Sequence, residues 1–204
     1  MRVIIAFLLV SISLAGCAQK RSTFDDYTAS VRDFQYELNK EFADKNESPL
    51  TPEDLESFNG LDFYPIDSTY RVIAKFEPEK DPEIFEMPTT TDRRPLYKTF
   101  GTATFELNGQ SLKLHVYQNQ ELIKQAEYEN HIFIPFTDLS SGNESYGGGR
   151  YIDLEVPRGD TLVIDFNKAY NPYCAYNHKY SCPIPPRENS LPVAIHAGVK
   201  AFKH

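Results

Sequence analysis

Beyond its first residues the sequence lacks any apolar run that could cross a membrane, and it is short of positive charge. The one sustained apolar run, Val3–Leu14, falls below the roughly 20 residues that a membrane-spanning helix needs. The chain carries 29 Asp and Glu against 21 Lys and Arg, a formal net charge of −8. Because an acidic surface is repelled by phosphate backbones, we expect no nucleic acid among its partners.

Nucleotide-binding motifs, internal repeats and low-complexity segments are also missing. No Walker or dinucleotide-binding glycine pattern occurs, and we predict no cofactor. No shift in composition marks a second domain. Removal of a signal peptide at residues 1–16 would leave 204 − 16 = 188 residues, which suits one domain with its own hydrophobic core.

The first residues have the layout of a secretion signal. A positive start precedes the apolar run, and Leu14-Ala15-Gly16-Cys17 resembles the bacterial lipobox. The resemblance implies cleavage before Cys17 and attachment of acyl chains such as palmitate, which tether a protein to a bilayer without spanning it. The alternative is an ordinary signal peptide with a chance cysteine.

These features predict the domain organisation and the location. We expect a signal peptide over 1–16, a lipidated tether over 17–23 and a single β-rich domain over 24–204. The lipid on Cys17 would hold the protein on a membrane of the bacterial cell envelope. The non-acidic Gln19 favours the outer membrane.

Cysteine is scarce, since Cys17, Cys174 and Cys182 are the only three. In an oxidising envelope a Cys174–Cys182 disulfide is permitted. Two buried reduced thiols, or a catalytic Cys174 activated by a histidine, are alternatives. His178 completes a C-x3-H-x3-C spacing that offers three of four zinc ligands, but no fourth is evident nearby, so we predict no metal site.

Two helices are expected before a series of strands. Segment 24–44 has apolar side chains at helical spacing, with Ser22 as its N-cap. A short helix follows within 49–60, where Thr51 caps the start and Pro52 takes the first position. Alternating patterns then predict strands at 70–76, 83–87, 95–107, 110–117, 131–136, 150–156, 161–166 and 191–197.

The strand pattern predicts a mainly β fold. Asn108-Gly109 joins two strands with the two-residue turn in which both residues have positive φ. About eight strands indicate an antiparallel barrel or sandwich, with the N-terminal helices covering one face or plugging one end. The irregular segment 165–200 is too aromatic for a disordered loop, and its prolines favour a rigid one.

A glycine-rich segment, 138–151, is the first candidate for a site. Its three consecutive glycines let backbone amides approach a ligand, and Arg150 follows them at the start of a strand. Together they could cradle a carboxylate or phosphate. The alternative is a turn in which Arg150 pairs with Asp138 or Glu144.

The second candidate is the polar and aromatic part of the irregular segment, 165–189. It combines hydrogen-bonding side chains with flat rings, as small-molecule pockets do. The alternative is that the asparagines hold the loop's backbone and the tyrosines fill its underside. The predicted ligand-binding residues are Arg150, Asp165, Asn171, Tyr176 and Asn189, and the candidates for catalysis are Asp138, Glu144, Asp165 and Cys174.

Several unusual runs of residues resemble those of one family. These runs are 48–50, 58–61, 135–138, 147–151, 165–176, 181–189, 191–195 and 197–198. Over nearly its whole mature length the chain is similar to bacterial and archaeal proteins grouped as domain of unknown function 1684. The resemblance implies no activity. It does imply that the acid usual at the position of Val199 is dispensable here, and the rarity of histidine at position 178 argues against a metal.

Three functions compete. The first is a lipid-anchored protein that binds a small polar or anionic ligand in a pocket formed by 138–151 and 165–189. The second is a hydrolase using carboxylates or a Cys–His pair in that pocket, and the third is a structural or partner-docking lipoprotein. Convergence of Asp138, Glu144, Arg150 and Asp165 on one cavity, together with Asn171 or Tyr176, would favour a pocket. Burial of Arg150 in an ion pair, together with a loop that lies flat, would favour the third function.

Overall fold

The computed structural model describes residues 23–203; the predicted signal peptide, Cys17 and the expected cap Ser22 lie outside the described residues. Helix α1 (Thr23–Ala43) and helix α2 (Pro52–Ser57) come first, as predicted. Thr51 caps α2, because its Oγ1 accepts the Asp54 N–H at 3.2 Å. Over residues 23–203, neither helix is both long and apolar enough to traverse a bilayer.

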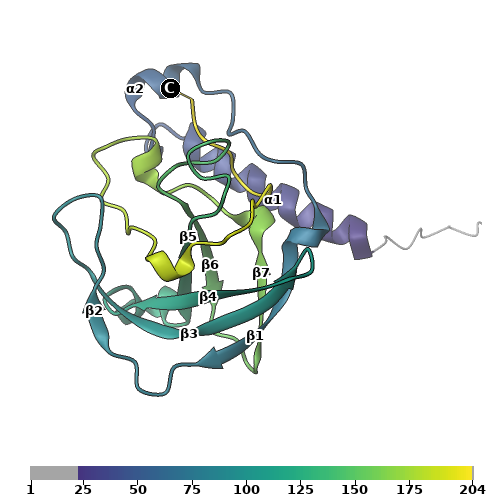
Figure 1. Ribbon diagram of the computed structural model, residues 1–204. Helices are drawn as coiled ribbons and strands as arrows, with labels where there is room; N and C mark the ends of the chain where they lie inside the picture. The colour runs from purple at the N-terminus through teal and green to yellow at the C-terminus, as the bar shows by residue number, and fades with distance from the viewer. Residues whose placement is uncertain (1–22, 204) are drawn as a thin grey trace, which may run out of the picture.

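Seven strands form one antiparallel sheet that curls into a half-barrel (Figure 1), which confirms the mainly β architecture. The order across the sheet is β6-β5-β4-β3-β1-β7, and β2 pairs with β3. Asn108 and Gly109 join β3 to β4 with φ of 51° and 75°, as the predicted turn requires. The bounds are β1 (Arg71–Pro78), β2 (Ile84–Glu86), β3 (Leu96–Leu107), β4 (Gln110–Asn119), β5 (His131–Phe136), β6 (Arg150–Glu155) and β7 (Thr161–Asp165).

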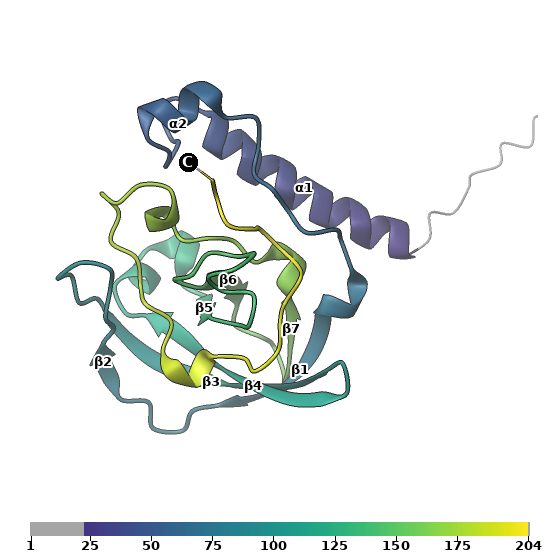
Figure 2. The ribbon, with the colours of Figure 1, turned by 45° about the horizontal axis from the view of Figure 1, so that its top comes forward.

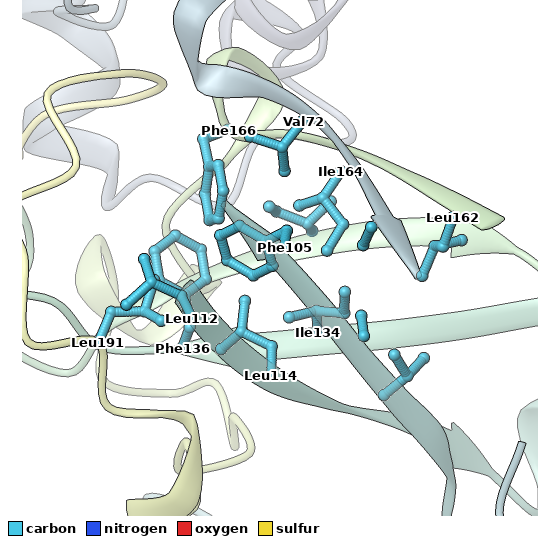
Figure 3. Close-up of a cluster of buried hydrophobic side chains, with 14 of the residues drawn as sticks. Val72, Phe105, Leu112, Leu114, Ile134, Phe136, Leu162, Ile164, Phe166 and Leu191 are labelled. Carbon is cyan, nitrogen blue, oxygen red and sulfur yellow. The ribbon is translucent and has the colours of Figure 1, made fainter. Parts of the chain in front are cut away.

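The main hydrophobic core fills the inside of the curled sheet (Figure 3). Alternate residues of each strand point inward, so that β1 contributes Val72, Ala74 and Phe76 while its other side chains face solvent. The rings of Phe136 and Phe166 meet edge to face, 5.3 Å apart. Burial of each large side chain contributes about 1.5–3 kcal/mol, which makes this core the main source of stability.

The two outer strands of the sheet meet at one point. Tyr170, which follows β7, pairs with Tyr151 of β6 through two backbone hydrogen bonds of 2.9 and 3.1 Å. This bridge joins the two edges of the curled sheet. An edge that is paired in this way no longer exposes its backbone groups there.

The prediction of an eighth strand at 191–197 is wrong. This segment is irregular, although Leu191, Ile195 and Ala197 are buried as a strand pattern suggests. At its start the segment pairs briefly with the chain after β5, where the Leu191 N–H donates to the Thr137 carbonyl at 2.8 Å. Further on, the Ile195 N–H donates to the Asp138 side chain at 3.1 Å, and Arg150 donates to the Ile195 carbonyl at 2.8 Å. Side chains therefore replace part of the strand pairing that the pattern predicts.

Helix α1 lies outside the curled sheet, with α2 near its C-terminal end (Figure 2). A smaller apolar cluster holds it in place, in which the ring of Phe42 meets that of Tyr176 at 4.7 Å. The helix thus covers the irregular segment after β7 more than the sheet itself. A space between the helix and that segment is where the candidate site lies.

Candidate functional site

Arg150 is fully buried and binds only other parts of the chain. Its Nη2 donates to Asp138 Oδ2 at 2.9 Å and to the Ile195 carbonyl at 2.8 Å. Its Nη1 donates to the carbonyls of Ala197 and, at 3.5 Å, of Val199. Asp138 is buried too, and its Oδ1 accepts the Ile195 N–H. Both charges are consumed in an internal network, so neither is placed to bind a ligand or transfer a proton.

Asp165 belongs to a different network, which fastens α1 to β7. Its Oδ1 accepts hydrogen bonds from the Tyr27 hydroxyl at 3.1 Å and from the Asn167 N–H and side-chain amide. The same Asn167 amide donates to the Asp67 carbonyl at 2.8 Å. Burial, and then the charge of Asp165, raise the pKa of Tyr27 above its usual value. Tyr27 therefore stays protonated and donates to the carboxylate.

Asn171 and Asn189 bind backbone groups of the chain, and Tyr176 contacts the Asn171 side chain. The Asn171 amide donates to the Lys200 carbonyl at 2.8 Å and to the Tyr176 hydroxyl at 3.2 Å. Asn189 is fully buried and accepts the His115 N–H at 2.7 Å while donating to two carbonyls. It links β4 to β5 where their direct pairing is reduced to a single residue pair.

Glu144 lies on the surface. Its Oε2 is 3.0 Å from His196 Nε2 and 3.5 Å from the Tyr64 hydroxyl, and the Tyr64 and His196 rings stack at 5.6 Å. More than half of each charged side chain of the pair is exposed, so the attraction is screened by solvent. Asp138 and Arg150 thus share one internal network, Asp165 belongs to another and Glu144 lies on the surface, so the four groups do not converge on one cavity in the described part of the chain.

Cys174 and Cys182 are free, buried thiols in the structure. They lie close together, since the Cys174 N–H donates to Cys182 Sγ at 3.2 Å. The Cys182 thiol, together with the Tyr146 and Thr90 hydroxyls, donates hydrogen bonds that lower the pKa of Cys174 to about 6. His178 is exposed. Among residues 23–203 no three His, Cys, Asp or Glu side chains gather as metal ligands do.

A cavity of about 400 Å³ lies between α1 and the irregular segment. Its volume is at the lower end of the range for small-molecule sites. The predicted segment 165–189 supplies much of its lining, whereas the predicted segment 138–151 supplies Tyr151 from its last position. The lining residues are Phe34, Leu38 and Glu41 from α1, Tyr151 and Asp153 from β6, and Tyr170, Pro172, Tyr173, Ser181, Cys182 and Pro183.

The barrel side of this cavity carries a chain of hydrogen bonds. The Tyr170 hydroxyl donates to Asp153 Oδ2, and Asp153 Oδ1 is 2.9 Å from His131 Nε2. Burial, and then the charge of Asp153, raise the pKa of Tyr170 above its usual value. Tyr170 is therefore the donor and Asp153 the acceptor.

The helix side repeats this arrangement with different residues. The Tyr173 hydroxyl donates to Glu41 Oε1, and burial followed by this hydrogen bond raises the pKa of Tyr173. Sequence reasoning missed Glu41, Asp153, Tyr170 and Tyr173 as site residues. The tyrosines stood in the suspected segment, but the two acids carry no local signal, since each looks like an ordinary exposed charge on a helix or strand.

Other hollows on the described residues are less suited to a ligand. One of about 490 Å³ lies beyond Asp153, along 126–131 and 153–155. Another, of about 730 Å³, lies between 45–56 and 177–179. Neither joins several aromatic faces to converging polar groups, as the cavity beneath α1 does.

We predict that Arg150→Met lowers the free energy of unfolding by about 3–5 kcal/mol, because Asp138 is left buried and uncompensated. The measurement is urea unfolding. Arg158→Met, in the exposed turn after β6, is the control and should change stability by less than about 0.5 kcal/mol. Equal losses of stability in the two variants would contradict a stabilising role for the buried Arg150–Asp138 pair. Asp138→Leu added to Arg150→Met should recover only part of the loss, since the C-terminal carbonyls remain without donors.

We also predict that Cys174 of the reduced protein forms a thiolate above about pH 6. Thiolate ultraviolet absorbance, followed against pH in a Cys17→Ser background, measures this step. Cys174→Ser should remove it, and Cys182→Ala should move it to higher pH, because the main hydrogen-bond donor to the Cys174 sulfur is lost. If the protein that keeps both Cys174 and Cys182 forms its first thiolate only at the pH of an ordinary thiol, the prediction is wrong. Non-reducing mass analysis would separately reveal a Cys174–Cys182 disulfide.

Comparison with known proteins agrees with the fold and gives no activity. The chain resembles an uncharacterized protein of Haloarcula marismortui, solved by solution NMR, with 35% identity and a TM-score of 0.68. The match covers 87% of this chain and 95% of that one. None of the curated proteins matches significantly. The family model for the protein of unknown function DUF1684 matches residues 56–200, so the chain belongs to the DUF1684 family.

Proposed function

We propose that this protein is a lipid-anchored protein of the bacterial envelope that binds a small polar ligand in the cavity beneath α1. The observation that carries the ligand proposal is the lining of the cavity, where tyrosine rings and two carboxylates surround about 400 Å³. Such a mixture of apolar faces and a few fixed polar groups is typical of small-molecule sites.

The chemistry favours a polar ligand over an anionic one. The guanidinium of Arg150, which was the main support for an anion, is enclosed by Asp138 and backbone carbonyls. The cavity itself is lined by Glu41 and Asp153, which would repel a carboxylate or phosphate.

The lipid anchor rests on the sequence around Cys17. Helix α1 begins at Thr23, six residues later, and six residues span at most about 20 Å. A lipid on Cys17 would therefore hold the N-terminal end of α1 near the membrane surface, whereas the cavity lies along the C-terminal half of the helix, at Phe34, Leu38 and Glu41. The outer membrane remains the favoured membrane.

A hydrolase is the second candidate. In its favour, the Cys174 sulfur lies 4.0 Å from the Tyr146 hydroxyl and close to Cys182, whose hydrogen bond lowers the pKa of the Cys174 thiol. Asp138 would not serve it, because both of its oxygens accept internal hydrogen bonds, and Asp165 Oδ1 already accepts three. Loss of any detected turnover in Cys174→Ser, but not in Asp165→Asn, would support this candidate. The burial of Arg150 supports the third candidate, a structural lipoprotein. Failure to find any ligand for the cavity would favour this candidate.

We predict that Cys17→Ser abolishes membrane attachment. Cells supplied with a labelled palmitate analogue should label the unaltered protein, which should partition into detergent. The Cys17→Ser protein should be unlabelled and remain in the aqueous phase. Cys174→Ser is the matched control and should keep the label. Labelling of the Cys17→Ser variant would overturn the proposal.

For the cavity, we predict that a panel of small polar fragments contains ligands that shift the NMR signals of Tyr151 and Tyr170. Leu38→Trp should block them, because the larger side chain fills the space from α1. Tyr36→Trp, on the same helix but 65% exposed, should leave binding unchanged. Binding that survives Leu38→Trp, or a panel with no such ligand, would count against a site here.

A further inference from the structure

The cavity beneath α1 holds negative charge on two of its sides. Glu41 reaches it from the helix and Asp153 from β6. Each carboxylate accepts a hydrogen bond from a neutral tyrosine, which orients it but leaves its charge in place.

No Lys, Arg or His belongs to the lining. Two basic side chains lie near its rim. Arg93 is committed to Ser181, donating to its carbonyl at 2.7 Å and its hydroxyl at 3.1 Å. His131 contacts the Asp153 oxygen that Tyr170 does not use. Glu41 and Asp153 therefore share the cavity lining with no basic side chain, and Asp153 contacts His131 outside that lining.

Aromatic rings form much of the remaining wall. Tyr151 and Tyr170 stand almost perpendicular, at 89°, with ring centroids 5.9 Å apart. Tyr173 and Phe34 complete the lining from the loop and from α1. Both rings line the cavity, and the electron-rich faces of tyrosine rings attract cations.

The carboxylates, the tyrosine rings and the volume of the cavity all suit one class of ligand. We propose that the cavity binds a small organic ammonium cation, held between the carboxylates of Glu41 and Asp153 against the faces of Tyr151, Tyr170 and Tyr173. This inference rests on the proposed function and specifies it. A metal ion would not need the rings, and an anion would face two carboxylates.

The test compares choline with 3,3-dimethyl-1-butanol, its neutral carbon isostere, in titrations of the full-length protein at constant ionic strength. Binding is followed by the NMR signals of the cavity tyrosines. Choline should bind at least about tenfold more tightly than the alcohol, because the shapes match and only the charge differs.

Variants then assign the charge. Glu41→Gln and Asp153→Asn keep acceptors for the tyrosine hydroxyls and should each weaken choline by about three- to tenfold while leaving the alcohol unchanged. Glu37→Gln is the matched control: it lies one turn earlier on α1, is exposed and pairs with Lys40. It should bind choline as the unaltered protein does.

A second set assigns the ring. Tyr173→Phe and Tyr173→Leu both remove the hydroxyl that binds Glu41, and only Tyr173→Phe keeps the aromatic face, so Tyr173→Leu should bind choline about threefold or more weakly than Tyr173→Phe. Tyr173 is 38% exposed, so both variants should unfold at similar urea concentrations. This unfolding control separates a lost contact from a lost fold.

The outcomes distinguish the inference from the proposed function. Equal binding of choline and the alcohol would overturn the ammonium inference and leave a ligand cavity. The same conclusion would follow if neither choline nor the alcohol binds, while other polar fragments bind and Leu38→Trp blocks them. Failure of every fragment would remove both. Choline binding that is insensitive to Glu41, Asp153 and Tyr173 would place it elsewhere and overturn the inference.

Discussion

The buried guanidinium of Arg150 is the interaction on which the C-terminal part of this fold depends. Four contacts, to Asp138 and to carbonyls of Ile195, Ala197 and Val199, give an irregular segment the hydrogen bonds that a strand would take from a ladder. The arrangement is costly to break, because removal of the cation leaves an acid and several carbonyls buried without partners. The same burial withdraws Arg150 from any ligand.

Once the C-terminal segment is held, the cavity follows from three further contacts. The Tyr151–Tyr170 bridge joins the edges of the sheet and sets two rings at right angles. The Tyr27–Asp165 hydrogen bond and the Phe42–Tyr176 ring contact place α1 over them. The site is therefore made between elements, and its acids and rings come from a helix, a strand and a loop that meet only in the folded chain.

The helices, the hairpin at Asn108-Gly109 and the β class could be predicted because short-range periodicity and turn chemistry specify them. The segment 191–197 misled the same reasoning, since its alternating burial reflects contact with the core rather than strand pairing. For the site, the sequence pointed to the loop that lines the cavity. Most of the residues singled out in that loop lie outside the lining. Asp165, Asn171 and Asn189 bind backbone and neighbouring side chains, as buried polar groups in a loop must.

By itself the sequence determined the family, the acidic balance, the order of the elements and the lipobox-like start, because each is written in neighbouring residues. Tertiary structure alone decided that Arg150 is enclosed and that Glu41 and Asp153 face one cavity with Tyr170 and Tyr173. The physical reason is that burial and convergence depend on the packing of segments more than 100 residues apart, as with Tyr173 and Glu41, whose separation is 132 positions. A pattern of neighbouring residues cannot predict a contact between side chains so far apart in the sequence.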